Sequence, residues 1–255
     1  MQKIICAVFL LLSANLFAQD NREFYLIRLY HFDEATQQKT TEEYLEKAWL
    51  PAMHRKGIKQ IGVFTPTGND TAVKKKLYLF IPLSSLNDVY RLDDELLKDQ
   101  QYLSAGATYI QTTHDKPSYN RIETFLLRAF SDMPKMEKPV LSGPVTDRVY
   151  ELRSYEGATE KLYRKKVEMF NKGGEIKLFK RLTFNAVFYG EVLTGGRMPN
   201  LMYMTSFDNM DERNKHWKNF VEAPEWKRLS ALPEYQHTVS KLDIILLHPR
   251  TYSDL

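Results

Sequence analysis

Apolar and polar residues alternate along the chain in two series that have the same order of elements. Residues 24–30 and 149–155 alternate as half-buried strands do, and each is followed by apolar residues at helical spacing. Each half therefore predicts the order strand, helix, strand, strand, helix, strand. The later predicted strands are 58–64, 77–81 and 122–127 in the first half and 183–189, 201–207 and 242–247 in the second.

Local signals predict the ends of the helices in the first half. Thr40 and Glu43 have the spacing of a capping box, which predicts that the first helix starts there, and Gly57 predicts its end. Pro51 lies inside this helix and predicts a kink, because proline has no backbone N–H to donate. Ser85 is the predicted cap of the second helix.

Corresponding signals occur in the second half. Apolar residues at helical spacing between 162 and 170 predict the first helix, and residues 175–182 predict an additional short helix. Asp208 is the predicted cap of the next helix. Pro224 predicts the start of a further helical turn, because proline fits the first helical position.

Three matches between the halves indicate an internal duplication. The first strands share Tyr, Arg and Tyr at an offset of 125 residues, and two later strand pairs match at offsets of 124 and 120. Because the matches keep their order, they favour two related domains over a short-period array. Each half would have helices on one face of an antiparallel sheet. The two open faces would then pack together as a barrel-like sandwich with a ligand cavity between them.

The N-terminus has the layout of a secretory signal peptide. Lys3 precedes an apolar run over 4–12, and small residues follow over 13–19. We therefore expect residues 1–19 to be removed and the protein to be exported, to the periplasm or outside the cell. The apolar run is too short to stay as a membrane anchor. Cys6 is the only cysteine, so the mature chain would have no thiol for disulfides, catalysis or zinc.

Composition narrows the remaining classes. The chain is 43% hydrophobic, which excludes a disordered chain. Its formal net charge of +4 is too small to indicate a nucleic-acid-binding surface. The segment 131–146 holds three prolines and is the predicted linker. The expected division is a first repeat over 20–130, the linker, and a second repeat over 147–255.

The second half resembles the NIPSNAP family. The resemblance is carried by 149–155, by Gly-Gly-Arg-Met-Pro-Asn over 195–200, and by 207–213 with Trp217 and 224–227 after it. It is close over 149–255 and weaker over 23–130, where the Arg-Met-Pro-Asn block is missing. The resemblance implies an α+β fold of two tandem ferredoxin-like repeats, packed sheet to sheet as an intramolecular α/β-barrel pseudo-dimer. It implies no particular reaction, because members mostly lack one and the wider superfamily includes cofactor-free monooxygenases, isomerases and haem-handling enzymes.

Strand alternation predicts which side chains line the cavity between the sheets. The more apolar faces of the first strands, with Tyr25, Ile27, Leu29, Tyr150 and Leu152, are expected to meet the helices. The opposite faces would line the cavity, where arginine can hold a carboxylate by two hydrogen bonds. The alternative is structural, with an Arg–Glu pair that only locks the halves together. The predicted cavity residues are Leu26, Arg28, Tyr30, Glu151, Arg153 and Tyr155.

Further candidates lie at the predicted mouth of the cavity and on the first helix. Arg197 and Asn200 could close over the mouth with Tyr189, or could only fix their loop by bonds to backbone. His54 is a candidate general base, as is Tyr155, although a histidine at a helix C-terminus is also favoured by the helix dipole.

Three functions remain open at this stage. The first is the binding of a small polar or anionic molecule between the sheets. The second is cofactor-independent oxygenation or isomerisation of a small carbonyl or carbohydrate-derived compound, and the third is a non-catalytic interaction module. No phosphate-binding or dinucleotide loop and no local metal-binding spacing of the six histidines is present, so we expect neither cofactor nor metal. Whether the protein is an enzyme or a homo-oligomer stays open.

Overall fold

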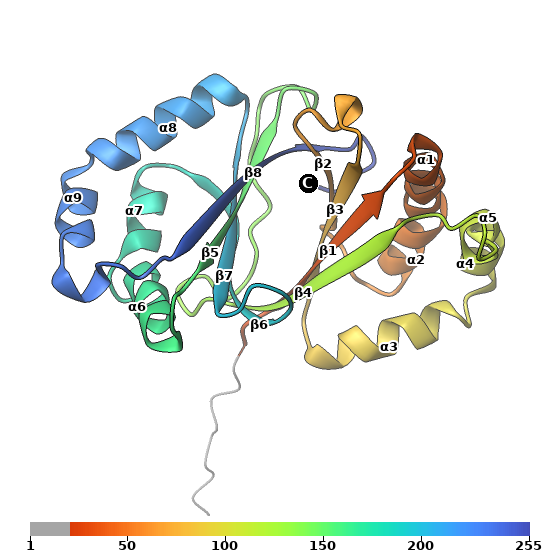
Figure 1. The fold of residues 1–255 in the computed structure, drawn as a ribbon, viewed down its shortest axis with the longest axis horizontal. Coiled ribbons are helices and arrows are strands. Elements are labelled where there is room, and N and C mark those ends of the chain that lie inside the picture. Colours follow the sequence, from red (N-terminus) through yellow and green to blue (C-terminus); the bar gives the residue numbers. More distant parts are fainter. Residues whose placement is uncertain (1–20) are drawn as a thin grey trace, which may run out of the picture.

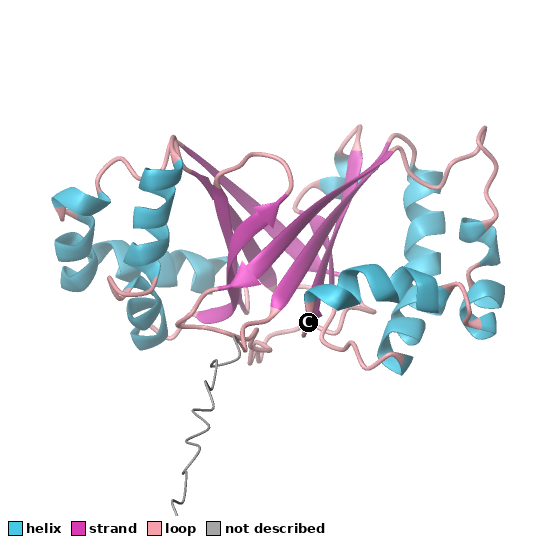
Figure 2. Cartoon of the chain, turned by 90° about the horizontal axis from the view of Figure 1, so that it is seen from below, coloured by secondary structure: helices cyan, strands magenta, loops and turns pink. Residues whose placement is uncertain are grey.

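The computed structural model describes residues 21–255, so the predicted signal peptide lies outside the described residues. Within them, eight antiparallel strands close into a barrel in the order β1-β3-β2-β8-β5-β7-β6-β4. Helices cover the barrel on two opposite sides, one group from each half of the chain (Figures 1 and 2). The predicted fold class, two tandem ferredoxin-like repeats packed sheet to sheet, is confirmed.

The first half supplies four strands and the helices on their outer side. The strands are β1 (Phe24–Phe32), β2 (Gly62–Pro66), β3 (Lys75–Leu83) and β4 (Arg121–Ala129). The helices are α1 (Ala35–Tyr44), a π-helical segment (Leu45–Trp49), α2 (Leu50–Arg55), a 3-10 turn (Asn69–Thr71), α3 (Leu86–Leu96), α4 (Gln100–Ala105) and α5 (Ala107–Ile110).

The second half repeats this order of elements. Its strands are β5 (Val149–Glu156), β6 (Asn185–Thr194), β7 (Asn200–Phe207) and β8 (Lys241–Pro249). Its helices are α6 (Glu160–Phe170), α7 (Glu175–Arg181), α8 (Met210–Glu222), α9 (Pro224–Ser230) and a 3-10 turn (Pro233–Tyr235). Two seams join the halves, where β2 pairs with β8 and β4 pairs with β6.

The first helix begins earlier than predicted. Gln37 accepts hydrogen bonds from the backbone N–H groups of Asp33 and Glu34, so the helix is capped there and Thr40 lies inside it. A π-helical segment directly precedes Pro51, where a kink was predicted, and in it the N–H of Leu50 donates to the carbonyl of Leu45. The missing N–H of proline removes one α-helical bond and makes this local change in winding easier.

The other helix signals give mixed results. Ser85 caps α3 and Pro224 begins α9, as predicted. Asn209 caps α8 in place of Asp208. The Asp208 carboxylate instead accepts hydrogen bonds from the N–H groups of Ser142 and Gly143, in the segment that joins the two halves. This exchange of partners could not be read from sequence, because it depends on a contact between distant segments.

One end of the barrel is filled with apolar side chains. Rings from three strands meet there, with centroids 5.2 Å apart for Tyr25 and Phe80 and 4.8 Å apart for Phe80 and Phe188. Met136, between β4 and β5, and the C-terminal Leu255 belong to the same buried cluster. The lumen is therefore solid at this end. Among the described residues, no helix has the length and apolar character that a membrane crossing needs.

Candidate functional site

The predicted assignment of strand faces is wrong by one residue of register. Tyr25, Ile27 and Leu29 lie inside the barrel with Tyr150 and Leu152, not against the helices. The alternate side chains point outward to the helices, including Leu26, Tyr30 and Tyr155. The apolar faces of the two sheets pack on each other inside the barrel, where Tyr25 contacts Phe188 and Phe64 contacts Tyr150. Glu151 and Arg153 on the opposite face have polar partners on the helix side, and neither they nor Arg28 line the lumen.

Glu151 and Arg153 lie in a buried polar network between the second sheet and its helices. Arg153 Nε is 2.5 Å from Glu151 Oε1, while Arg213 Nε and Trp217 Nε1 donate to Glu151 Oε2 at 2.7 and 2.9 Å. The guanidinium carbon of Arg153 lies 3.6 Å from the centroid of the Trp217 ring. Every oxygen of this fully buried carboxylate is therefore used inside the protein. The network therefore has a structural role, but it joins β5 to α8 within the second half and does not lock the two halves together as the structural alternative expected.

The tyrosines predicted to line the cavity also lie in this helix layer. Tyr155 accepts a hydrogen bond from Arg153 and shares another with Tyr203, with 2.8 Å between the two hydroxyl oxygens. Tyr189 lies in the same aromatic cluster, and burial raises the pKa of its hydroxyl well above the usual value. Beside them, Lys166 Nζ lies 2.8 Å from Glu175 Oε2, and both side chains are buried.

The corresponding residues of the first half and His54 lie away from the lumen as well. Tyr30 packs under the first group of helices, and burial raises the pKa of its hydroxyl while the charge of Arg28 partly offsets the rise. His54, at the end of α2, pairs with Asp254 at 2.9 Å between Nε2 and Oδ2. Asp254 also accepts from the N–H of Ile61, so His54 helps to hold the C-terminal segment.

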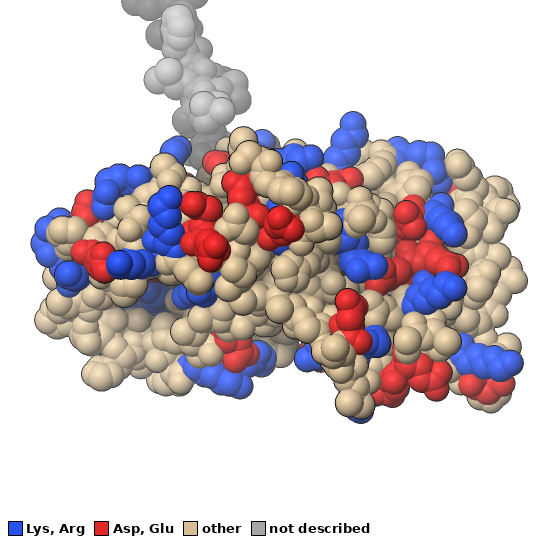
Figure 3. All heavy atoms as spheres, turned by 90° about the horizontal axis from the view of Figure 1, so that it is seen from above, with Lys and Arg blue, Asp and Glu red and all other residues tan. Residues whose placement is uncertain are grey.

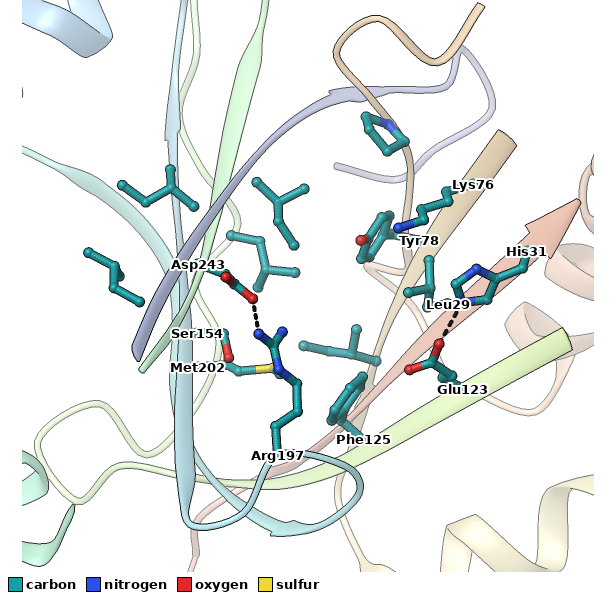
Figure 4. A pocket seen from close by; sticks show the side chains of 16 residues that line it. Leu29, His31, Lys76, Tyr78, Glu123, Phe125, Ser154, Arg197, Met202 and Asp243 are labelled. Atoms are coloured by element: carbon teal, nitrogen blue, oxygen red, sulfur yellow. Dashed lines mark ion pairs between the residues drawn. The ribbon is translucent and has the colours of Figure 1, made fainter. Parts of the chain in front are cut away.

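The open end of the barrel holds the candidate site. A cavity of about 540 Å³ begins above the packed rings and opens at the mouth between the two sheets (Figure 4). Its floor and walls are largely apolar, and polar side chains stand around the rim. The apolar lining includes Ile27, Leu29, Phe125, Leu152, Met202 and Ile245, and the polar lining includes His31, Lys76, Tyr78, Glu123, Ser154, Arg197 and Asp243.

The first half supplies one polar side of the mouth. His31 Nε2 lies 2.6 Å from Glu123 Oε1, and Figure 4 shows this pair on the same side as Lys76 and Tyr78. Burial raises the pKa of Tyr78 to about 12, with a smaller contribution from the charge of Glu123, so its hydroxyl is a neutral donor at pH 7. None of these four residues was among the predicted site residues. Polar side chains at alternate positions near the strand ends could have indicated that these residues face the mouth of the barrel.

The second half supplies the opposite side, which is internally paired. Arg197 contacts Asp243 and also Glu156, with Nε 2.6 Å from Glu156 Oε1. Arg197 therefore lies at the mouth, and its loop packs on the wall, since a Cβ on Gly195 would be only 2.8 Å from the Phe125 ring. Asn200 is fully buried and donates to Ser154 Oγ at 2.9 Å, so it supports the mouth without lining it.

The duplication shows that the two sides occupy equivalent positions. His31 pairs with Lys76 across β1 and β3, as Glu156 pairs with Asn200 across β5 and β7. Leu29 pairs with Glu123 as Ser154 pairs with Asp243. The first half thus has histidine where the second has glutamate, and lysine where the second has asparagine. Among residues 21–255, no group of three or more His, Cys, Asp or Glu side chains could hold a metal ion.

Comparisons with known proteins agree with this architecture. The NIPSNAP family model matches residues 150–254. The chain is similar in structure to a candidate monooxygenase from Lactobacillus acidophilus NCFM, with 10% identity, a TM-score of 0.59, and coverage of 89% of this chain and 94% of that one. A candidate monooxygenase from Fusobacterium nucleatum subsp. nucleatum has 10% identity and a TM-score of 0.57, with coverage of 89% of this chain and 92% of that one. An anthrone oxidase-like protein has 11% identity and a TM-score of 0.50, with coverage of 90% of this chain and 92% of that one. At these identities the similarity shows the fold alone. The comparison with curated proteins finds no match.

Proposed function

From the match of residues 150–254 to the NIPSNAP family and from the half-open barrel, we propose that the chain binds a small organic molecule at the barrel mouth. The apolar body of the ligand would lie against the floor of the lumen. Its acidic or carbonyl end would contact Lys76 and Tyr78. Binding is thus proposed between the sheets, but by other residues than the strand pattern predicted.

The size and lining of the cavity support a ligand with an apolar body. Its volume of about 540 Å³ lies within the range of ordinary ligand pockets, and is several times the roughly 150 Å³ that holds a benzene molecule in an engineered cavity. Leu29 and Phe125 line it on neighbouring strands, and Leu152 and Met202 line it from the other sheet. An apolar group that replaces water against these side chains would supply most of the affinity.

Two donors at the rim that have no partner within the described residues carry the proposal for an acidic or carbonyl end. Within residues 21–255, Lys76 has no carboxylate at ion-pair distance, although beside the same cavity His31 has one and Arg197 has two. The Tyr78 hydroxyl has no hydrogen-bond partner there either, yet it faces the cavity. These two donors would be satisfied by an acceptor from the ligand.

The charges on the outer surface would not select an acidic ligand, so this selection would depend on contacts at the mouth of the cavity. On the face shown in Figure 3, basic and acidic side chains are interspersed. Such a mixed face produces little long-range field of one sign. The preference for an acidic ligand would therefore depend on Lys76, and it would weaken when this single charge is removed.

Calorimetric titration with 3-phenylpropanoate and with its uncharged amide tests the proposal. We expect the acid to bind roughly 10-fold to 100-fold more tightly than the amide, because a hydrogen bond to a charged group contributes about 1.5–3 kcal/mol. Lys76→Met should remove this preference. Lys74→Met is the matched control, because Lys74 is a neighbouring exposed lysine outside the cavity. Absence of binding, or equal binding of acid and amide, would contradict the proposal.

We also propose that the protein is exported. The basic residue, apolar run and small residues within positions 1–19 support this proposal. N-terminal sequencing of the protein recovered from the periplasm or medium of an expressing bacterium tests it. An N-terminus near residue 20 would agree with export. An intact N-terminus on protein found only in the cytoplasm would refute it.

A further inference from the structure

Three neighbouring strands place a row of polar side chains on the first-half side of the mouth. On β1, His31 faces Lys76 of β3 directly, and Leu29 lies between Glu123 of β4 and Tyr78 of β3. Directly opposed residues in antiparallel strands have Cβ atoms about 4.5–5.5 Å apart. All five side chains line the same cavity. The row therefore brings a carboxylate, an imidazole, an ammonium and a phenol to one edge of an apolar pocket.

The imidazole of His31 is held in a manner suited to a base. Glu123 Oε1 lies 2.6 Å from Nε2, so the carboxylate stands at this edge of the ring and Nδ1 is the ring nitrogen on the other side. Among the described residues, Nδ1 of His31 has no partner. Three other histidines have ring nitrogens engaged in structural contacts, namely His54 with Asp254, His216 with the carbonyl of Glu212, and His248 with Thr67 and the carbonyl of Arg148.

The equivalent positions of the second half do not offer this arrangement. Glu156 and Asp243 occupy the places of His31 and Glu123, and Arg197 contacts both carboxylates. On this side of the mouth, Arg197 is therefore held by two carboxylates of the protein itself. A base, a cation and a neutral hydroxyl donor come together only on the first-half side of the described mouth.

We propose that the mouth catalyses proton transfer at carbon, the keto–enol tautomerisation of 2-oxo acids that carry an apolar group next to an acidic C–H. The inference rests on the proposed binding function. Nδ1 of His31 removes the proton from the carbon next to the carbonyl. The electrons of the C–H bond form the C=C bond, while the C=O π electrons move to oxygen. This oxygen takes a hydrogen bond or proton from Tyr78.

The reaction needs no oxidant and no co-reactant. When the enol leaves, His31 gives its proton to water and Tyr78 takes one from water. In the reverse direction His31 donates a proton to carbon and Tyr78 regains its own from oxygen, so atoms, charges and electrons balance in both directions. Lys76 holds the carboxylate of the substrate and adds positive charge near the enolate oxygen. Glu123 acts as a positioning residue through the imidazole. Preorganised donors of this kind stabilise the charge that develops on oxygen in the transition state.

Exchange of the C3 protons of phenylpyruvate in D2O, followed by proton NMR, tests the inference. We expect exchange faster than in buffer, and a 10²-fold to 10⁴-fold loss in His31→Gln, because general-base catalysis typically contributes this much. Glu123→Gln should lower the turnover number with little change in KM. His54→Gln is the matched control and should exchange as the wild type does, because His54 lies outside the cavity.

Titration with 3-phenylpropanoate, which lacks the carbonyl, separates the two claims. Binding with no enhanced exchange in the wild type would overturn the inference and leave the proposed binding function standing. Exchange that persists in His31→Gln, while binding is unchanged, would also overturn it. If neither ligand binds and no exchange occurs, both claims fail. Loss of exchange in His31→Gln with 3-phenylpropanoate still bound is the result that we expect.

Discussion

Removal of the Glu151 carboxylate should be one of the most damaging single substitutions in the second half. Glu151 is fully buried and accepts hydrogen bonds from Arg153, Arg213 and Trp217. In Glu151→Gln the side chain keeps its shape and loses its charge. One amide N–H group would then face an arginine donor. Two cations would remain in a site that is 9% exposed at Arg153.

The magnitude follows from the burial of the pair. Breaking a buried ion pair by removing one partner costs about 3–5 kcal/mol, and Arg213 can turn partly to solvent, so we expect about 3–4 kcal/mol. For a chain of this size, that corresponds to a fall in melting temperature of roughly 6–16 °C. Replacing Glu212 by Gln is the control, because Glu212 pairs with Lys215 on the surface and should contribute less than about 0.5 kcal/mol.

Urea unfolding followed by tryptophan fluorescence measures this loss. Trp217 reports on the site directly, because its indole donates to Glu151 and packs on Arg153. A loss below about 1 kcal/mol with an unchanged dependence on urea would refute the reasoning. It would mean that the carboxylate is not needed to hold the two arginines, and that the network can rearrange at little cost.

Three other perturbations probe the helix layer, the mouth and the closed end. Lys166→Met should lower the free energy of unfolding, measured in urea, by about 3–5 kcal/mol. Adding Glu175→Leu should recover at least half of this loss, because no buried charge then lacks a partner; additive losses in the double variant would contradict this. At pH 9 the Tyr78 hydroxyl is largely neutral in both the folded and the unfolded protein. At pH 11 only the unfolded hydroxyl is largely ionised, because burial raises the folded pKa to about 12. The wild type should therefore lose about 1.4 kcal/mol more stability than Tyr78→Phe between pH 9 and pH 11; equal losses would show that the hydroxyl is not shielded. Leu255→Ala should cost about 2–4 kcal/mol by thermal unfolding, because its side chain plugs the lumen; an unchanged melting temperature would show that the plug is dispensable.

The architecture could be predicted from the sequence because both halves keep the same alternation of apolar and polar residues in their strands. The strands around Tyr25 and Tyr150 alternate, their offsets agree with those of the later strands, and two half-barrels can satisfy each other's open faces. The helix starting at Ala35 was predicted too late, because its capping box uses Glu34 at the cap position, where serine or threonine is the usual sequence signal.

The site could not be predicted in the same way, because alternation shows that two faces differ and not which face is inside. Arg153 and Glu151 appeared suited to a polar cavity, yet partners from α8 satisfy them in the helix layer. Those partners are more than 60 residues away in the sequence and become neighbours only in the fold. Conversely, His31 and Lys76 lie near strand ends 45 residues apart in the sequence, and they become neighbours beside the cavity only because β1 pairs with β3 in the fold.

A crystal structure of the protein with 3-phenylpropanoate tests the central claim most directly. We expect the phenyl ring against Leu29 and Phe125, and the carboxylate within hydrogen-bond distance of Lys76 or Tyr78. An empty mouth at saturating ligand, or a ligand bound in the helix layer beside Arg153, would contradict the account.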